Sequence, residues 1–325
     1  MSQSLSGQVS PVPPEPPARE RSSLFVSGVF PRHRGRLLAL SAVAGVLLAY
    51  VWSAEFVDNQ IGSRAADAIL GHDAAATPIA GLLSGTVFAF VTGLAGTFTA
   101  CNIAVFGAVG PLVGQEQDGP GRLRRTLAPI GWIAAGMIPV SALYGVLVGV
   151  MGTHMPQFSL TREPGLQPRI VQAMVVFGII GLVMIVLGLA AAGLVPDPLA
   201  GVSRRFPQAP LVLMGVLIGA FLIGRPYPLF RQLFHDAAEK RNPLYGATAF
   251  TLQSLGNILI MAVLVLALAY LTGERLQRAL ARNPSRVAAV TAGAFLVAGV
   301  FMVVYWDLRI LGRFDYIWFP TAPWN

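Results

Sequence analysis

Hydrophobic residues in this chain fall into long uncharged runs that short polar segments separate. A transmembrane helix needs about 20 consecutive apolar residues. The pattern predicts seven such helices, at residues 37–54, 79–96, 128–151, 170–195, 209–224, 245–271 and 287–306. The alternating segments of about ten residues that are typical of a membrane barrel do not occur. The predicted fold class is therefore an all-α polytopic membrane protein.

The longest uncharged stretch, residues 74–115, is too long for one span and awkward for two. Its apolar first part is followed by a polar cluster and then by a Gly/Pro-rich tail. Polar groups at membrane depth occur where they are buried in protein or line a cavity. We therefore expect a broken helix that carries the functional site, with the only cysteine at the break. A lone buried cysteine is equally typical of ordinary apolar packing. The cluster comprises Thr97, Thr99, Cys101 and Asn102.

Composition supports the membrane assignment and excludes several classes of function. Hydrophobic residues make up 54% of the chain, charged residues 12%, and the mean hydropathy is +0.64. The net charge of +8 resides in short loops rather than on one face of a soluble domain, so we expect no nucleic-acid partner. One cysteine excludes an internal disulfide, and the four histidines lie far apart outside the runs. We expect no bound metal and no cofactor.

Basic loops predict the orientation of the chain. Lys and Arg favour the cytoplasmic side, and basic residues cluster at 32–36, 122–125, 204–205 and 275–286. We expect a bacterial-type inner (plasma) membrane protein with its N-terminus in the cytoplasm and its C-terminus outside. Residues 1–35 form a Pro/Ser-rich tail that we expect to be disordered, 36–54 an anchor helix, and 309–325 an aromatic segment at the outer interface. The basic stretch 225–241 disagrees with this orientation.

Without the anchor helix, six helices remain in two groups of three, 79–195 and 209–308. Units with an odd number of spans have opposite orientations, so these would be inverted repeats. The first helix of each unit ends in helix-breaking residues, in TFTACNIAVFGAVGP and in GRPYPLF. Paired interruptions of this kind indicate a site between the repeats, although Gly and Pro are common in membrane helices generally.

The second unit adds five candidate residues to this site. Arg225 could supply a positive charge across the repeat interface, or extend to the lipid headgroups. Gln253 and Asn257 lie four positions apart on one helical face, so they would point into the core together, where interhelical polar packing is the alternative. The remaining two are Pro226 and Pro228, which flank Tyr227 in the second interruption. A surface helix is expected over 229–243, which is amphipathic.

Three segments resemble the CcdA/DsbD family of cytochrome c biogenesis proteins. GLLSGTVFAFVTGLAGTFTACNIAVFGAVGP is similar to the family's first helix, with Cys101 at the family's cysteine. GIIGLVMIVLGLAAAGLV resembles its third helix, and PLVLMGVLIGAFLIGRPYPLF its fourth. The chain departs from the family at Ala100, where the motif has proline, and in the second unit, which has no cysteine. The resemblance implies six core helices in two inverted halves that pass reducing equivalents across the membrane.

Two functions follow from these observations. In the first, Cys101 exchanges disulfides with thioredoxin-like proteins or small thiols, and the neighbouring hydroxyl and amide groups stabilise its thiolate. A single thiol cannot store two electrons as an internal disulfide, so partner thiols are required. In the second, the protein transports a small solute or a metal ion through a cavity between the repeats. The superfamily that resembles CcdA also contains exporters. An accessory subunit of a membrane complex is a third possibility, and the oligomeric state stays open.

Overall fold

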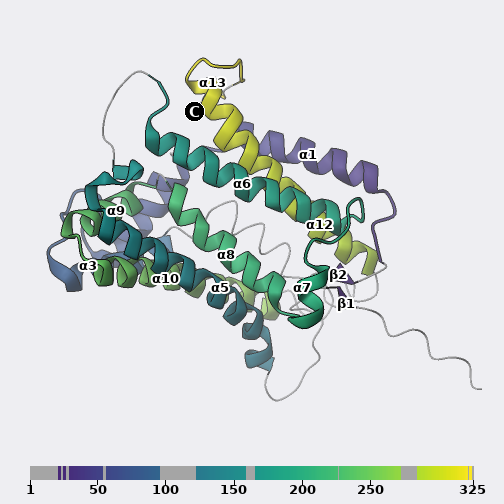
Figure 1. Cartoon of the computed structure of the whole chain (residues 1–325), viewed down its shortest axis with the longest axis horizontal. Helices are drawn as coiled ribbons and strands as arrows, with labels where there is room; N and C mark the ends of the chain where they lie inside the picture. Colours follow the sequence, from purple (N-terminus) through teal and green to yellow (C-terminus); the bar gives the residue numbers. More distant parts are fainter. Residues whose placement is uncertain are drawn as a thin grey trace, which may run out of the picture.

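A computed structural model describes residues 21–22, 25–26, 29–53, 56–95, 122–158, 165–225, 227–271, 284–320 and 322–323. Nearly all of the described regular structure is helical (Figure 1). Two short antiparallel strands, β1 (Arg21–Ser22) and β2 (Phe25–Val26), precede the helices. The helices are α1 (Arg34–Val51), η1 (Phe56–Ser63), α2 (Arg64–Leu70), α3 (Gly81–Ala95), α5 (Arg122–Met151), η2 (Gly152–His154), η3 (Pro156–Phe158), α6 (Pro168–Ala191), α7 (Ala200–Arg205), α8 (Ala209–Gly224), α9 (Pro228–Lys240), α10 (Pro243–Leu271), α12 (Pro284–Val303), η4 (Val304–Leu308) and α13 (Arg309–Arg313).

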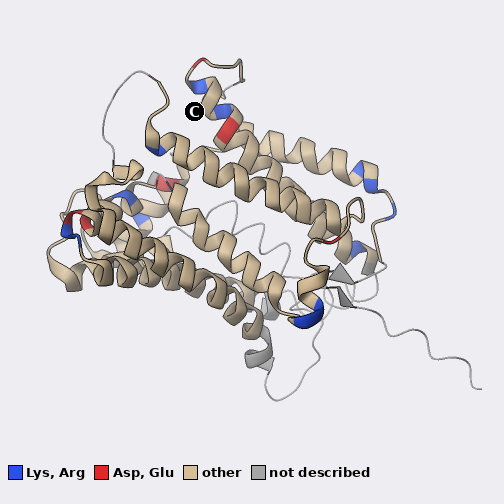
Figure 2. Cartoon of the chain, in the orientation of Figure 1, with Lys and Arg blue, Asp and Glu red and all other residues tan. Residues whose placement is uncertain are grey.

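Five of the described helical segments are long and apolar enough to cross a membrane. They correspond to α1, α5, α6, α10 and the continuous α12–η4–α13 segment. A sixth candidate is α8 together with α9, which is bent by 79° at the break between them. Helix α3 is apolar but has only 15 residues. The structure therefore has the architecture of a polytopic helical membrane protein, as the hydrophobic pattern predicts. Figure 2 shows charged residues near the ends of the bundle and largely uncharged helix sides between them.

The long helices pack in the spatial order α3, α10, α5, α8, α6, α12 and α1. Small residues bring several of these pairs into backbone contact, which is how apolar helices associate without a hydrophobic driving force from lipid. At the crossing of α5 and α10, a Cβ at Gly145 would collide with the carbonyl oxygen of Gly246, and the reverse also holds. At the crossing of α6 and α12, Gly181 and Gly299 face each other in the same way.

The contacts between these helices also fix their relative directions. Helices α5 and α8 run parallel, and so do α3 and α10. Helix α10 is antiparallel to α5, and α6 is antiparallel to both α8 and α12. The contacts join Gly136 with Val212 and Gly219 with Val140 (α5, α8), Gly85 with Tyr245 and Gly93 with Gln253 (α3, α10), Gly145 with Gly246 and Gly149 with Pro243 (α5, α10), Gly224 with Ala173 and Phe221 with Phe177 (α8, α6), and Gly178 with Asp307 and Gly188 with Leu296 (α6, α12).

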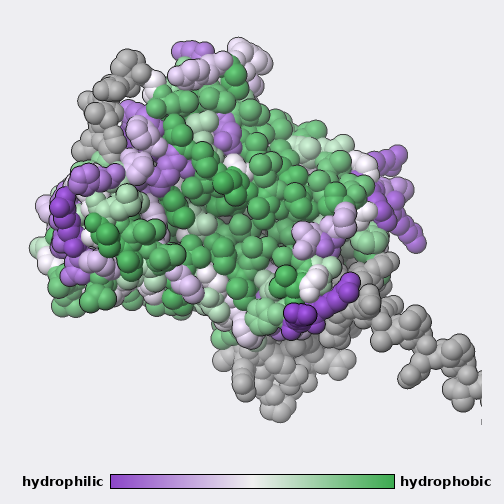
Figure 3. All heavy atoms as spheres, in the orientation of Figure 1, coloured by the Kyte–Doolittle hydropathy of each residue, from purple (hydrophilic) through white to green (hydrophobic). Residues whose placement is uncertain are grey.

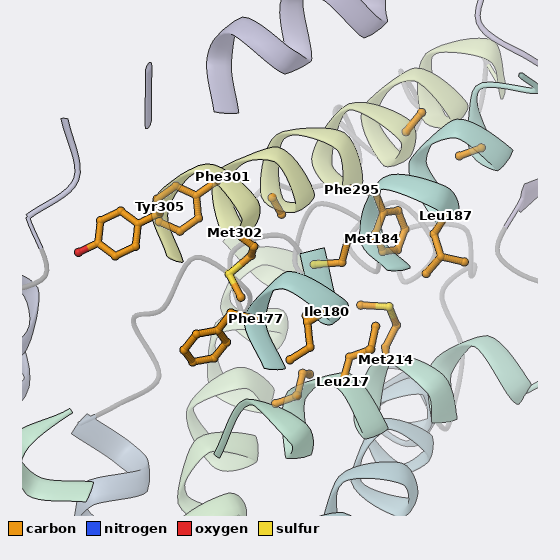
Figure 4. Packing of buried hydrophobic residues seen from close by; sticks show 14 of the residues in the cluster. Phe177, Ile180, Met184, Leu187, Met214, Leu217, Phe295, Phe301, Met302 and Tyr305 are labelled. Atoms are coloured by element: carbon orange, nitrogen blue, oxygen red, sulfur yellow. The ribbon is translucent and has the colours of Figure 1, made fainter. Parts of the chain in front are cut away.

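The apolar core has two parts. One lies among α6, α8 and α12, where aromatic and methionine side chains interdigitate (Figure 4). The other lies beneath α9, whose buried face is Leu229, Phe230, Leu233, Phe234, Ala237 and Ala238. The amphipathic helix predicted over 229–243 is therefore present, and its apolar face packs into the protein. The face of the bundle in Figure 3 is a broad apolar surface, as expected for a protein surrounded by lipid.

Regular structure begins earlier in the N-terminal segment than the sequence predicts. We expect residues 1–35 to be disordered, whereas β1 and β2 pair within this range. The Phe30 ring packs against Gly193, and the Arg34 guanidinium lies 4.8 Å from the centre of that ring. Arg34 also donates a hydrogen bond to the Gly193 carbonyl. These contacts attach the start of α1 to the end of α6. Residues 1–20 lie outside the described part.

Candidate functional site

The predicted site divides into residues that the structure describes and residues that it does not. Four side chains of the first interruption, Thr97, Thr99, Cys101 and Asn102, lie outside the described residues. Pro226, in the second interruption, does too. The described part of the chain stops at Ala95, the last residue of α3, and resumes at Arg122. The candidate residues that can be placed are Arg225, Pro228, Gln253 and Asn257.

Gln253 and Asn257 lie one turn apart near the middle of α10 and are almost completely buried, with 1% and 9% of their surfaces exposed. The C-terminal half of α3 packs directly on them, because Gly93 contacts the backbone of α10 at both positions. Gly256 makes the reciprocal contact with the carbonyl of Phe90. The chain therefore leaves α3, six residues before Cys101, next to two buried amides.

A pair of hydroxyl groups extends this polar set onto α5. Ser254 and Ser141 form a hydrogen bond of 2.6 Å, and Ser141 also donates to the carbonyl of Met137. Gln253 Oε1, by contrast, is buried and has no hydrogen-bond partner in the described part of the chain. Leaving a buried polar group unpaired costs free energy. In the middle of the bundle, Gln253 Oε1 could therefore accept a hydrogen bond that none of the described residues donates.

The break between α8 and α9 forms a second, separate polar cluster. A helix end leaves carbonyl groups without intrahelical partners, and within a membrane protein these need side chains to satisfy them. Gln172 from α6 donates to the carbonyl of Ile223, and Gln157 from η3 donates to that of Arg225 at 3.0 Å. Tyr144 from α5 donates in turn to Gln157 Oε1. Three elements therefore stabilise the end of α8.

Arg225 itself is buried, with 5% of its surface exposed. Its guanidinium lies 5.0 Å from the centre of the Tyr227 ring, and it does not extend to the headgroups, the alternative that the sequence left open. Asp58 of η1 lies close enough for the two charges to interact. Burial raises the pKa of the Asp58 carboxyl to about 6, and the positive charge of Arg225 opposes this shift.

The structure does not bring the predicted residues into one site. Gln253 lies ten residues into α10, which is about 15 Å along the helix from the end where α9 joins it. Arg225 and its partners lie at the α8–α9 break, at the opposite end of α9. Pro228 is exposed and occupies the first turn of α9, where its lack of an N–H group costs nothing.

Four residues of the polar cluster at the α8–α9 break are absent from the sequence-based prediction. Gln172 had a readable signal, since it is a polar residue inside an otherwise apolar run. Asp58, Tyr144 and Gln157 had none, because only contacts between distant elements bring them to the α8–α9 break.

No protein-family model matches this chain, and the searches of curated proteins and solved structures returned no match either. The resemblance to the CcdA/DsbD family stays a prediction from the quoted segments.

Proposed function

We propose that the chain is built of two inverted three-helix repeats, with α3, α5 and α6 in one and α8, α10 and α12 in the other. The directions of the helices support this arrangement, because each helix runs opposite to its counterpart. The pairings support it as well: α5 packs on its counterpart α10 and α6 on its counterpart α12. Helix α3 packs on α10 as α8 packs on α5, which are equivalent pairs.

The glycines at these equivalent crossings correspond in detail. In α3, Phe90 contacts Gly256 and Gly93 contacts α10; in α8, Val212 contacts Gly136 and Gly215 contacts α5. In both helices the contacting residue lies three positions before the glycine. Nearly the same sequence interval separates Gly93 from Gly215 and Gly136 from Gly256. The first helices of the two repeats thus make the same type of contact with the opposite repeat, and a site at this interface would lie between the repeats.

The function that this arrangement supports best is thiol-disulfide exchange across the membrane, as in cytochrome c biogenesis. The Cys101 thiolate would attack the disulfide of a partner, forming a mixed disulfide and releasing one partner thiolate. A second thiol, from a thioredoxin-like protein or a small thiol, would then attack the mixed disulfide and regenerate Cys101. The two electrons come from the partner thiols, because this chain has no second cysteine.

One observation carries this proposal: near its end, α3 packs on the backbone of α10 at the two buried amide residues Gln253 and Asn257. Uncharged hydrogen-bond donors near a cysteine favour its thiolate, which is the reactive form. A trapping experiment tests the exchange. Membranes containing the full chain are treated with a thioredoxin-like protein that lacks its resolving cysteine and carries thionitrobenzoate in disulfide linkage on its remaining cysteine. Attack by the Cys101 thiolate releases thionitrobenzoate, and the resulting mixed disulfide between the two proteins is detected without reductant.

Trapping is expected with the native chain and is lost in Cys101→Ser. Thr86→Ser is the matched control, because the Thr86 hydroxyl bonds within α3 to the carbonyl of Leu83 and serine retains that hydroxyl, so trapping should be unchanged. An alkylating reagent that fails to modify Cys101 in membranes, together with unchanged thiol transfer by Cys101→Ser, would rule out the exchange function.

Transport of a small solute is the second candidate, and the unpaired Gln253 Oε1 favours it. A solute with a hydrogen-bond donor, or a dehydrated cation, would satisfy this oxygen. Gln253→Leu should then reduce flux in reconstituted vesicles while Cys101→Ala leaves it intact. The thiol function predicts the opposite dependence on Cys101, so the two substitutions distinguish the proposals.

A further inference from the structure

A carboxylate lies within the long apolar segment α12–η4–α13. Asp307 belongs to η4, the π-helical turn that joins α12 to α13. Single π-helical turns within a longer helix are rare and occur frequently at functional sites. Ionisable residues within membrane-spanning segments are also rare and are usually functional. Neither proposed function uses Asp307.

Gly178 of α6 forms the surface against which this carboxylate packs. A Cβ at Gly178 would lie 3.1 Å from Asp307 Oδ2 and 3.2 Å from Oδ1, so both oxygens lie close to the α6 backbone. Oδ2 is buried and has no hydrogen-bond partner among the described residues. A side chain at residue 178 would press on the carboxylate. The fit between α6 and η4 therefore depends on glycine at this position.

The surroundings of the carboxylate are apolar. Gly178 lies ten residues after Pro168, about 15 Å along α6, and within the apolar run 170–195. Toward the core, the rings of Phe177 and Trp306 pack with 4.4 Å between their centres. Three apolar residues with exposed side chains lie within one turn of Gly178 on α6: Val175, Ile179 and Leu182. A carboxylate here is next to lipid-facing side chains and aromatic rings rather than to water.

No positive charge in the described part of the chain forms an ion pair with Asp307. Arg309, two positions further on, instead donates to the carbonyls of Ala49 and Trp52 at the end of α1, and its guanidinium lies 4.7 Å from the centre of the Tyr305 ring. The elements that pack against η4 are α1, α6, α12 and α13. Their charged and titratable residues toward this end of the bundle are Tyr50, Arg169, Arg309 and Arg313.

We propose that Asp307 is a reversible proton-binding site at the contact between η4 and α6. An isolated carboxylate in apolar surroundings is costly, and a bound proton removes its charge. A larger cation would need room beside Oδ2, which is buried against α6. Arg313 ends the segment six residues further on, about 9 Å along the helix. The proton therefore exchanges with the water at this end of the bundle, and the site requires neither thiol exchange nor transport.

Labelling with dicyclohexylcarbodiimide tests this site on the full-length protein in lipid vesicles. This apolar reagent enters the lipid and adds to a protonated carboxyl group, forming a stable N-acylurea that retains all atoms of both molecules. Peptide mapping by mass spectrometry locates the label. Labelling of Asp307 should fall about tenfold or more between pH 5 and pH 9, because the carboxylate form does not react.

Two variants control this experiment. Asp307→Asn should lose the label, because the amide has no acidic proton. Asp315→Asn is the matched control, since Asp315 is an exposed carboxylate just beyond α13. It should leave the labelling of Asp307 and its dependence on pH unchanged.

Infrared spectroscopy detects the same proton without a reagent. The difference between spectra at pH 5 and pH 9 should contain a carbonyl stretching band of a protonated carboxyl group that Asp307→Asn removes. This band decides the outcome if the reagent does not reach Asp307, and the labelling of the native chain decides it if Asp307→Asn does not fold. Absence of the label at pH 5 with no infrared band that depends on Asp307, or equal labelling of Asp307 at pH 5 and pH 9, overturns the proposal.

Discussion

Gln157 connects three elements at the α8–α9 break through two buried hydrogen bonds. It donates to the carbonyl of Arg225 and accepts from the hydroxyl of Tyr144. Gln157→Leu removes both of these hydrogen bonds from buried groups, which should cost about 2–4 kcal/mol of stability. The expected result is a clearly lower melting temperature in detergent. Gln232→Leu is the control, because Gln232 also donates to a carbonyl but lies at an exposed contact. Equal melting temperatures for the two variants would contradict this role of Gln157.

Asp58 should make stability depend on pH. Burial raises the pKa of its carboxyl from 3.8 to about 6 in the folded protein, so the folded chain retains this proton at a pH where the unfolded chain has lost it. The contribution of Asp58 to stability is therefore greatest below about pH 4 and decreases as the pH rises to about 6. Melting temperatures of the native chain and Asp58→Asn, measured between pH 4 and 7, should differ in slope over this interval. The exposed Asp315, replaced by Asn, should keep the native slope.

At the scale of single residues, the sequence identifies the buried polar groups that interrupt apolar runs. Gln253 and Asn257 stand out in this way, and both are buried as predicted. It does not identify Asp58 or Gln157, because both lie in polar connecting segments where such residues are ordinary. Their burial results from contacts with α5, α8 and η1 that no local pattern encodes.

At the scale of helices, the crossing of α5 and α10 depends on two glycines that let the backbones touch. Gly145→Ala places a Cβ against the carbonyl oxygen of Gly246, which should separate the helices and cost about 1–3 kcal/mol. Gly131→Ala is a matched control on the same helix, because nothing lies within 4 Å of its Cβ position. This control should be neutral or stabilising by up to about 1 kcal/mol, since alanine favours the helix. The measurement is thermal unfolding in detergent. Equal melting temperatures for the two variants would show that the crossing tolerates a side chain at residue 145.

Helix boundaries can be predicted from the sequence where helix-terminating residues such as proline flank an apolar run. Helix α8 begins and ends at the predicted residues 209 and 224, because prolines flank the apolar run at both ends. Helix α5 instead begins at Arg122, six residues before the predicted start. Hydropathy marks where a helix enters the apolar layer, and a helix can continue beyond it in polar residues. For the same reason, the apolar pattern did not predict η1 and α2, which lie between the first two predicted spans.

At the scale of the whole molecule, the directions of the helices define two ends, one basic and the other carrying both acidic residues and the basic residues of 225–241. The starts of α1, α8 and α12 lie at one end with α7, and this end includes Arg34, Arg204, Arg205 and Arg286. Asp58, Asp67 and Asp73 lie between the end of α1 and the start of α3, at the other end. Positive charge favours the cytoplasmic side. We therefore expect α7 in the cytoplasm and the segment around η1 and α2 outside.

Single cysteines introduced at the two ends test this orientation. In a Cys101→Ser background, Ala76→Cys and Gly201→Cys each replace a small exposed residue, one before α3 and one in α7. A maleimide that cannot cross membranes should label Ala76→Cys in intact cells and Gly201→Cys only after permeabilisation. The reverse pattern would invert the topology.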